Sequence, residues 1–289
     1  MFCKEHNIQE PYNASYEQGL QFLAHLFEEG NNYGSIAVAR SALSAILPRK
    51  GDFTFGKDKI VSQLLKGIFK LRPSLPKYTS TYDPDIILDY INELPANSQL
   101  NLELLTKKLV TLLALLSGQR CQSISYLETQ QSALINGVYC FYIPRVLKTT
   151  KPGHHLHALE FHQYVPNANI CVVTCIKEYV SRTELIRENN GAQTLILSYA
   201  YPHKAVGSAT VARYIKDFLN AAGIDLKTFS AHSTRSASTS KAKKIGMSIL
   251  DINKAAGWKG TSTFRKHYDL PMHNRYDNEL QKSYMGNKH

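Results

Sequence analysis

Hydrophobic side chains recur every three or four residues along much of the chain, which is the spacing of helices that bury one face. The first part of the chain contains three such stretches. The clearest of them carries Ile60, Val61, Leu64, Leu65 and Ile68. The pattern therefore predicts a small helical domain over residues 1–75.

A second stretch in this part follows Ser35, whose hydroxyl is suited to capping a helix. Its spacing predicts that four side chains turn toward the core, namely Val38, Leu43, Ile46 and Leu47. Lysines line the outer face of the third stretch, at Lys57, Lys59, Lys66 and Lys70. Such a row is typical of a solvated helix face, and it is also suited to contacts with a polyanion.

The helical period stops in the segment 71–82, which contains two prolines. We interpret this segment as an extended basic linker with the bounds 76–84. A second domain is then expected over residues 85–289. Its first helix begins near Asp83 and Pro84, because aspartate favours the capping position and proline the first helical position.

Helical periodicity also dominates the second domain. Its longest apolar helix is expected over residues 102–116, with Gly118 supplying the break behind it. Residues 138–143 are β-branched and aromatic, and together with 155–161 they predict a β-hairpin. Further helices are expected near 170–188, 208–222, 230–245 and 249–256. The fold class is therefore mainly α with a small β-hairpin or sheet, an α+β protein.

The composition of the chain indicates a class of binding partner and a cellular compartment. The 289 residues carry a formal net charge of +11, with a sequence pI near 9.3. This excess indicates a polyanion, and nucleic acid is favoured over an anionic membrane surface. The longest apolar run, near residues 109–116, is too short to span a bilayer. An odd number of cysteines and a start without a signal-peptide pattern favour a soluble intracellular protein, nuclear in a eukaryote.

A metal site is the first chemical hypothesis that the sequence raises. Four histidines and two cysteines lie in one region, namely His154, His155, His157, His162, Cys171 and Cys175. Known zinc spacings do not link the histidines to the cysteines. We therefore favour buried thiols and hairpin histidines, and we expect no metal.

The second hypothesis centres on His232 and Arg235, which lie three residues apart and share one helix face. Trp258 and Tyr268 follow downstream. A phenol with its ordinary pKa of about 10 is a poor nucleophile, so a reactive tyrosine needs cations and proton-transfer partners around it. Arg120 lies at a predicted helix junction, where an arginine alone more often bonds to the preceding carbonyls.

These residues, taken in order with a lysine on the hairpin, resemble the active site of tyrosine recombinases, also called phage-type integrases. The six positions are Arg120, Lys148, His232, Arg235, Trp258 and Tyr268. The resemblance covers most of the chain and is best over residues 120–271. It implies that residues 1–75 form a core-binding domain that clamps DNA and that 85–289 form the catalytic domain. The residues around Tyr268 are similar to those of mobile-element recombinases.

The family chemistry implied here is site-specific DNA cleavage and rejoining through a 3′-phosphotyrosyl bond, without metal, ATP or another cofactor. Tyr268 would attack the scissile phosphate, and His232 would transfer protons. The resemblance assigns the non-bridging oxygens to Arg120 and Arg235, whose planar forks suit them. Lys148 would protonate the leaving 5′-oxygen, and Trp258 would donate its N–H to the phosphate.

The sequence departs from the family pattern in two respects and leaves one choice open. The interval from Trp258 to Tyr268 is about one residue longer than is usual in the family, which a loop can absorb. The family often has a carboxylate three residues after the first arginine, where this chain has Ser123. Lys151 competes with Lys148 for the hairpin position. Other cations are expected to contact backbone phosphates, namely Lys151, Lys241, Lys243, Lys244, Arg265 and Lys266.

The implied partners are double-stranded DNA and further copies of the chain, in a tetrameric synapse on DNA. Two alternatives use nearly the same residues. One is an enzyme similar to type IB topoisomerases, which the helical first segment disfavours. The other is a catalytically silent DNA-binding protein derived from a recombinase, although the chain lacks none of the six side chains.

Overall fold

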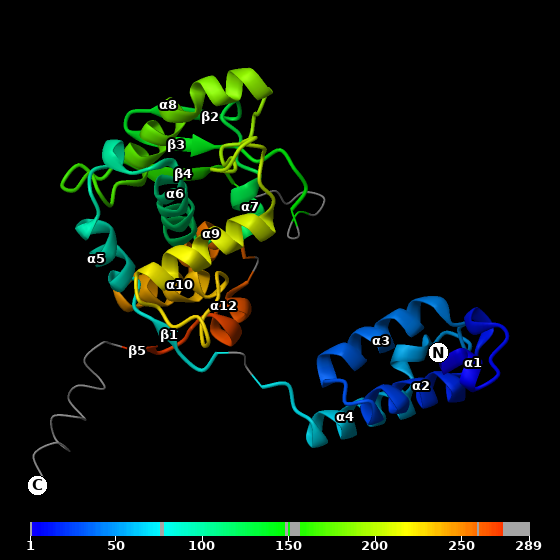
Figure 1. The fold of residues 1–289 in the computed structure, drawn as a ribbon. Helices are drawn as coiled ribbons and strands as arrows, with labels where there is room; N and C mark the ends of the chain where they lie inside the picture. Colours follow the sequence, from blue (N-terminus) through cyan, green and yellow to red (C-terminus); the bar gives the residue numbers. More distant parts are fainter. Residues whose placement is uncertain (1, 76–77, 148–149, 151–156, 259, 274–289) are drawn as a thin grey trace, which may run out of the picture. The chain divides into compact units, whose positions relative to one another are not determined.

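The computed structural model describes residues 2–75, 78–147, 150, 157–258 and 260–273. The chain divides into two compact units, Met1–Lys77 and Tyr78–His289. Helices dominate both units, and the described part of the second unit adds short strands (Figure 1). The predicted fold class is confirmed.

The first unit is mainly helical over its described length, with an isolated antiparallel bridge between Lys50 and Phe53. Its elements are α1 (Phe2–Glu5), α2 (Tyr16–Glu28), α3 (Tyr33–Ile46) and α4 (Lys59–Leu71), with 3-10 turns at Pro11–Asn13 and Phe55–Lys57. Side-chain caps fix the starts of the longer helices. Ser15 and Gln18 form a capping box on α2, and Asp58 accepts two backbone N–H groups of α4.

One prediction for this unit is wrong. Val38 and Ile46 were expected inside but are 70% and 48% exposed. Leu43 and Leu47 do pack in the core as predicted, and Ile36, which was not predicted, also lies in the core. Val38 lies two residues beyond Ile36, about 200° around the helix axis, so the two cannot face the same core.

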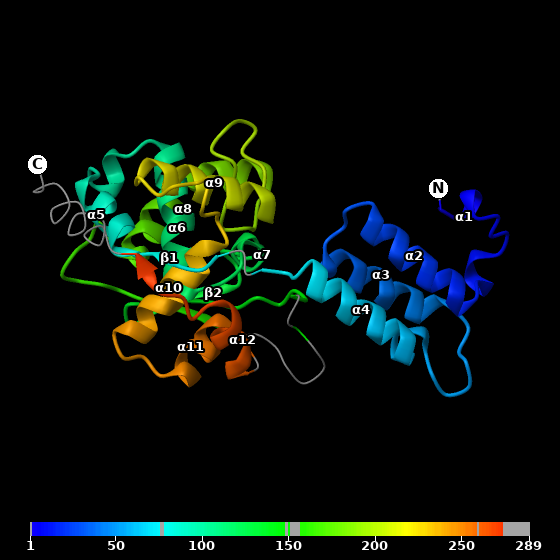
Figure 2. The same cartoon turned by 90° about the horizontal axis from the view of Figure 1, so that it is seen from below.

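Helix α6 (Leu102–Ser117) runs through the centre of the second unit, and ten of its residues are buried. The remaining helices of the unit are α5 (Asp85–Glu93), α7 (Cys121–Ser125), α8 (Val172–Asn190), α9 (Ser208–Ala221), α10 (Ser233–Lys244), α11 (Ile249–Ala256) and α12 (Thr261–His267), with a 3-10 turn at Asn97–Gln99. Helices α8, α9 and α10 all pack against α6 (Figures 1 and 2).

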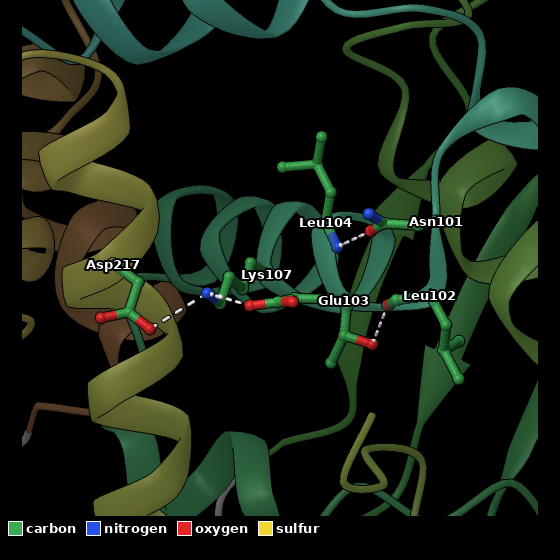
Figure 3. Close-up of polar contacts among 7 residues, drawn as sticks. Asn101, Leu102, Glu103, Leu104, Lys107 and Asp217 are labelled. Atoms are coloured by element: carbon green, nitrogen blue, oxygen red, sulfur yellow. Dashed lines mark hydrogen bonds and ion pairs between the residues drawn. The ribbon is translucent and has the colours of Figure 1, made fainter. Parts of the chain in front are cut away.

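Figure 3 shows how α6 begins and how it is fixed to α9. The Asn101 side chain accepts the N–H of Leu104 and caps the helix. One turn on, Lys107 bridges Glu103 at 2.7 Å and Asp217 of α9 at 3.1 Å. Lys107 is partly covered but both carboxylates are exposed, so this bridge orients the two helices and contributes only modestly to stability.

The second unit contains an antiparallel sheet in the order β2-β3-β4, formed by Ser132–Ile135, Val138–Phe141 and Leu159–His162. The predicted pairing of the two hairpin strands is confirmed, since Tyr139 lies opposite Phe161. Strand β2 was not predicted. It faces solvent at Leu134 and Ile135, so its sequence lacks a clean alternation.

A second, parallel pairing joins distant parts of the chain. Strand β1 (Thr81–Tyr82) lies beside β5 (Met272–His273). The N–H of Thr81 also donates to the carbonyl of Pro271 at 2.9 Å. Strand β1 falls within the segment 76–84 that was interpreted as a linker, and both of its residues are buried. This pairing holds the segment that follows Tyr268 against the rest of the second unit.

Two structural findings concern the membrane and metal hypotheses. None of the described helices is long and apolar enough to cross a membrane. Within the same residues, no three His, Cys, Asp or Glu side chains gather closely enough to hold a metal ion. Two of the histidines considered for a metal site, His154 and His155, lie outside the described residues.

Candidate active site

Helix α10 presents both His232, at its capping position, and Arg235, in its first turn. The side chains that face inward are small, at Ser233, Thr234, Ser236, Ala237, Thr239 and Ser240. Because they are short, the helix backbone packs closely against α6 and buries the long arginine. Arg235 is 1% exposed, whereas His232 is exposed.

Arg235 is a buried cation without a carboxylate partner in the described structure. Its Nη2 donates to the carbonyl of Ala256 at 2.7 Å, the last residue of α11. The negative end of that helix dipole therefore offsets part of the charge. Its Nε and Nη1 are buried and have no hydrogen-bond partner among the described residues. Two donors of one fork are thus left without an acceptor in the part of the chain that the structure describes.

The charge state of Arg235 follows from this environment. Burial lowers the pKa of Arg235 to about 10, and the positive charge of Arg120 contributes to the shift. The phenol of Tyr268 opposes it. Arg235 is therefore protonated at neutral pH, and Arg120 lies close enough for the two guanidinium groups to repel each other.

Trp258 packs against both the cation and the phenol, and the Arg235 guanidinium also lies 5.5 Å from the Tyr268 ring centroid. The guanidinium carbon of Arg235 lies 4.4 Å from the Trp258 ring centroid, and the Trp258 and Tyr268 rings stack at 4.5 Å with 29° between their planes. Gly257 ends α11 at a φ of 68°, a conformation that favours glycine, and so turns the chain into Trp258. The indole Nε1 is buried and also lacks a hydrogen-bond partner in the described structure.

Tyr268 follows α12 and is 8% exposed. Its ring packs in a small apolar cluster with Ile252, Ala256, Trp258 and Phe264. The phenol oxygen lies 3.1 Å from Nε2 of His232. A proton can pass between these two atoms directly, which is what activation of a phenol requires.

Arg120 occupies the capping position of α7, as the helix-junction prediction required. Its guanidinium makes no hydrogen bond or ion pair within the described residues. The neighbouring Gln119 is 5% exposed, and its amide donates to the carbonyl of Ala255 at 2.8 Å. The segments that carry Arg120 and Arg235 therefore both attach to the end of α11.

Sequence reasoning missed Gln119. The family pattern directs attention to the residue three positions after Arg120, where Ser123 stands. Ser123 is buried, but it does not take the place of a carboxylate. A glutamine beside the arginine carries no signal in the sequence, because its partner is a backbone carbonyl 136 residues away.

The remaining predicted cations are arranged differently from one another. Lys148 and Lys151 lie outside the described residues, as does the side chain of Lys266. Lys241 binds Asp83 and Asp85, and Lys243 binds Asp269 at 2.5 Å. Lys244 and Arg265 are exposed.

Ser240 is a second residue that sequence reasoning missed. Its hydroxyl donates to the carbonyl of Tyr268 at 2.6 Å and accepts the N–H of Leu270 at 3.1 Å. A serine within a run of small hydroxyl residues gives no sign of such a contact in the sequence.

The comparisons with known proteins agree with this geometry. The model of the phage integrase family matches residues 87–274, which is more than half of the chain. The chain belongs to the phage integrase family. The resemblance to tyrosine recombinases is thereby confirmed, and with it the enzyme class. No sequence among the curated proteins matches the chain.

Solved structures of the family share the fold at low identity. A XerH site-specific recombinase bound to difH substrate in a pre-cleavage complex has a TM-score of 0.60 at 15% identity, covering 96% of this chain and 74% of that one. The Tn1549 transposon integrase in complex with transposon right end DNA has a TM-score of 0.55 at 13% identity, covering 96% and 87%. A lambda integrase dimer bound to a COC′ core site gives 0.51 at 16% identity, covering 92% and 83%.

Proposed function

We propose that the chain cleaves and rejoins double-stranded DNA at specific sites, with Tyr268 as the nucleophile. One observation carries this proposal. A buried Arg235 without a carboxylate partner and an indole N–H without an acceptor, both judged over the described residues, lie beside a phenol that is hydrogen-bonded to His232. Buried cations are normally paired, so this arrangement is suited to an anion that arrives with the substrate.

The proposed step is an in-line displacement at phosphorus. The Tyr268 oxygen bonds to phosphorus as the bond to the 5′-oxygen breaks, which gives a 3′-phosphotyrosyl link and a free 5′-hydroxyl. His232 takes the phenol proton in this direction and returns it during religation. Because the number of phosphate ester bonds is unchanged, rejoining needs no nucleotide.

Charge in the transition state is spread over the non-bridging oxygens of the phosphate. Nε and Nη1 of Arg235 offer one of them a pair of donors in a water-excluded setting, where such donors are most effective. Arg120 approaches from the neighbouring helix junction, and Trp258 adds its N–H. A lysine of the hairpin, Lys148 or Lys151, protonates the leaving 5′-oxygen.

The DNA substrate and the assembly are inferred partly from the relatives. The similar structures of XerH and of the Tn1549 integrase hold DNA, and the lambda integrase one is a dimer on DNA. The net charge of +11 supports the same partner here. We infer that several copies act together on one DNA, up to a tetrameric synapse, inside the cell and in the nucleus of a eukaryote.

Residues 1–75 serve as a core-binding domain in this proposal, and 85–289 as the catalytic domain. The exposed Lys244 and Arg265 are suited to backbone phosphates, as is Lys266. Lys241 and Lys243 hold carboxylates of their own chain, so a contact of either with DNA would compete with an ion pair.

The test is capture of the covalent intermediate. Overlapping duplexes from the DNA that flanks the coding region are nicked near the cleavage position, so that the short 5′-hydroxyl fragment diffuses away. The wild-type chain is expected to form adducts that survive denaturation, whereas Tyr268→Phe forms none and still binds DNA. Adducts that persist in the variant would disprove the nucleophile. A folded wild-type chain that binds these duplexes without any adduct would support the silent DNA-binding protein.

A further inference from the structure

Ser240 lies on α10 within the same unit as the proposed site, and it is 5% exposed. Its hydroxyl lies between two backbone groups on either side of Asp269, the carbonyl of Tyr268 and the N–H of Leu270. A hydroxyl can donate to the first and accept from the second at the same time. One side chain therefore satisfies both groups.

These two backbone groups lie where regular structure has stopped. Helix α12 ends at His267 and β5 begins only at Met272. Neither the Tyr268 carbonyl nor the Leu270 N–H has another hydrogen-bond partner among the described residues. Without the Ser240 hydroxyl, the two peptide planes that flank Asp269 would lose their hydrogen bonds to α10. The first of these planes would keep only the hydrogen bond from the Asp269 N–H to the carbonyl of Phe264, within its own segment.

A second contact acts on the same segment. Lys243, one turn after Ser240 on α10, binds the carboxylate of Asp269 at 2.5 Å. Residues 268, 269 and 270 are thus each held by α10, by a backbone or a side-chain group. Helix α10 also packs against β1, β5 and α11, and α11 packs against α12 (Figures 1 and 2).

The same helix carries His232 and Arg235. A helix is rigid over this length, so the proposed proton acceptor, the phosphate-binding cation and the hydroxyl of Ser240 keep fixed positions relative to one another. The segment that bears the phenol is then aligned to that frame through Ser240.

We propose that Ser240 is a positioning residue, which sets the direction from which the Tyr268 phenol approaches the phosphate. This inference rests on the proposed function of Tyr268. In-line attack needs a fixed angle as well as a short distance, and a displacement of about 1 Å can cost about a hundredfold in rate. Ser240 itself touches neither the phosphate nor the phenol oxygen.

The experiment compares Ser240→Ala, Ser240→Thr and wild type on a nicked duplex that wild type cleaves. Three quantities are measured, namely the single-turnover rate of adduct formation, the Kd for the duplex and the melting temperature. Ser240→Ala is expected to slow adduct formation by about ten- to a hundredfold with an unchanged Kd. Ser240→Thr keeps the hydroxyl and is expected to restore most of the rate.

Ser238→Ala is the matched control, because among the described residues the Ser238 hydroxyl bonds only to the backbone carbonyl of Arg235 in its own helix. It is expected to react at the wild-type rate. A folded Ser240→Ala that reacts as fast as wild type would overturn the proposal. A threonine variant as slow as the alanine variant would also overturn it.

If Ser240→Ala does not fold, Ser240→Cys replaces it, since a thiol has similar shape but is a weak donor and acceptor. The cysteine variant is then expected to fold and to react slowly, and a wild-type rate would count against the proposal. Failure of the proposed function would give a different result. Tyr268→Phe would then still form the adduct, and the Ser240 variants would say nothing about its formation.

Discussion

Nε2 of His232 and the phenol oxygen of Tyr268 lie 3.1 Å apart, and the two residues are 36 positions apart in the sequence. The histidine begins α10 and the tyrosine follows α12, so their contact depends on how these helices pack with α11. The packing of these helices thus brings the phenol within hydrogen-bond distance of an imidazole nitrogen.

Replacing His232 tests this contact. His232→Ala should lower the single-turnover rate of adduct formation by about 10²- to 10⁴-fold, the usual effect of losing a proton-transfer group. The Kd for DNA should stay close to that of wild type. His162→Ala, which removes an exposed histidine at the end of β4, serves as control and should keep the wild-type rate. Equal rates in both variants would exclude His232 from the chemistry.

Arg235 should couple anion binding to stability. Sulfate or inorganic phosphate should raise the melting temperature above that in chloride of equal ionic strength, because the anion binds only the folded site. Arg235→Met should lose this difference, whereas Arg213→Met, at an exposed arginine of α9, should keep it. A difference that survives in Arg235→Met would place the anion elsewhere.

The pH dependence of that effect has a definite sign. Arg235 has a pKa of about 10, lowered by burial, so it carries its charge below that pH and loses it above. The anion-dependent rise in melting temperature should therefore be constant between about pH 7 and about pH 9 and should fall as the pH passes the pKa of Arg235. Scanning calorimetry of wild type and Arg235→Met isolates this part from other titrations.

Gln119 should position Arg120. Gln119→Ala leaves the Ala255 carbonyl without its side-chain donor and should cost about 1 to 3 kcal/mol of stability. It should also slow adduct formation while DNA binding is kept. Gln122→Ala is the control, since that amide contacts only the Tyr126 hydroxyl of its own region. A loss of stability without any change in rate would reduce Gln119 to a structural residue.

The hairpin lysine can be identified by chemistry. A substrate with sulfur in place of the 5′-bridging oxygen has a leaving group that needs no proton. The lysine that acts as general acid should be dispensable on this substrate and required on the oxygen one. Of Lys148→Ala and Lys151→Ala, we expect the former to be rescued in this way. Rescue of Lys151→Ala instead would reassign the role.

Cleavage should occur within one chain. His232, Arg235 and Tyr268 already meet in a single copy, and Ser240 holds the tyrosine segment to α10. A mixture of Tyr268→Phe and Arg235→Lys should therefore form no more adduct than the two variants do separately. Restored activity in the mixture would mean that one copy supplies its tyrosine to another.

Local patterns in the sequence predicted much of this fold. Periodicity located α6 and α9, and glycine marked the ends of α6 and α11, because these signals lie within one element. The pairing of β1 with β5 was not predicted, because two-residue strands 190 positions apart carry no periodic signal in the sequence. The order of the six candidate residues along the sequence predicted the site. The residues that support these side chains gave no recognisable signal in the sequence. Gln119 and Ser240 act on backbone atoms, which every residue has.

The buried charge of Arg235 also bears on the history of the gene. An unpaired cation in a protein interior weakens the fold, and apolar replacements at such positions are often neutral or stabilising. A protein that binds DNA without cleaving it does not need this arginine, so we expect such a protein to replace it with an apolar residue. An arginine here is therefore the residue that we expect in a chain that keeps the proposed cleavage function.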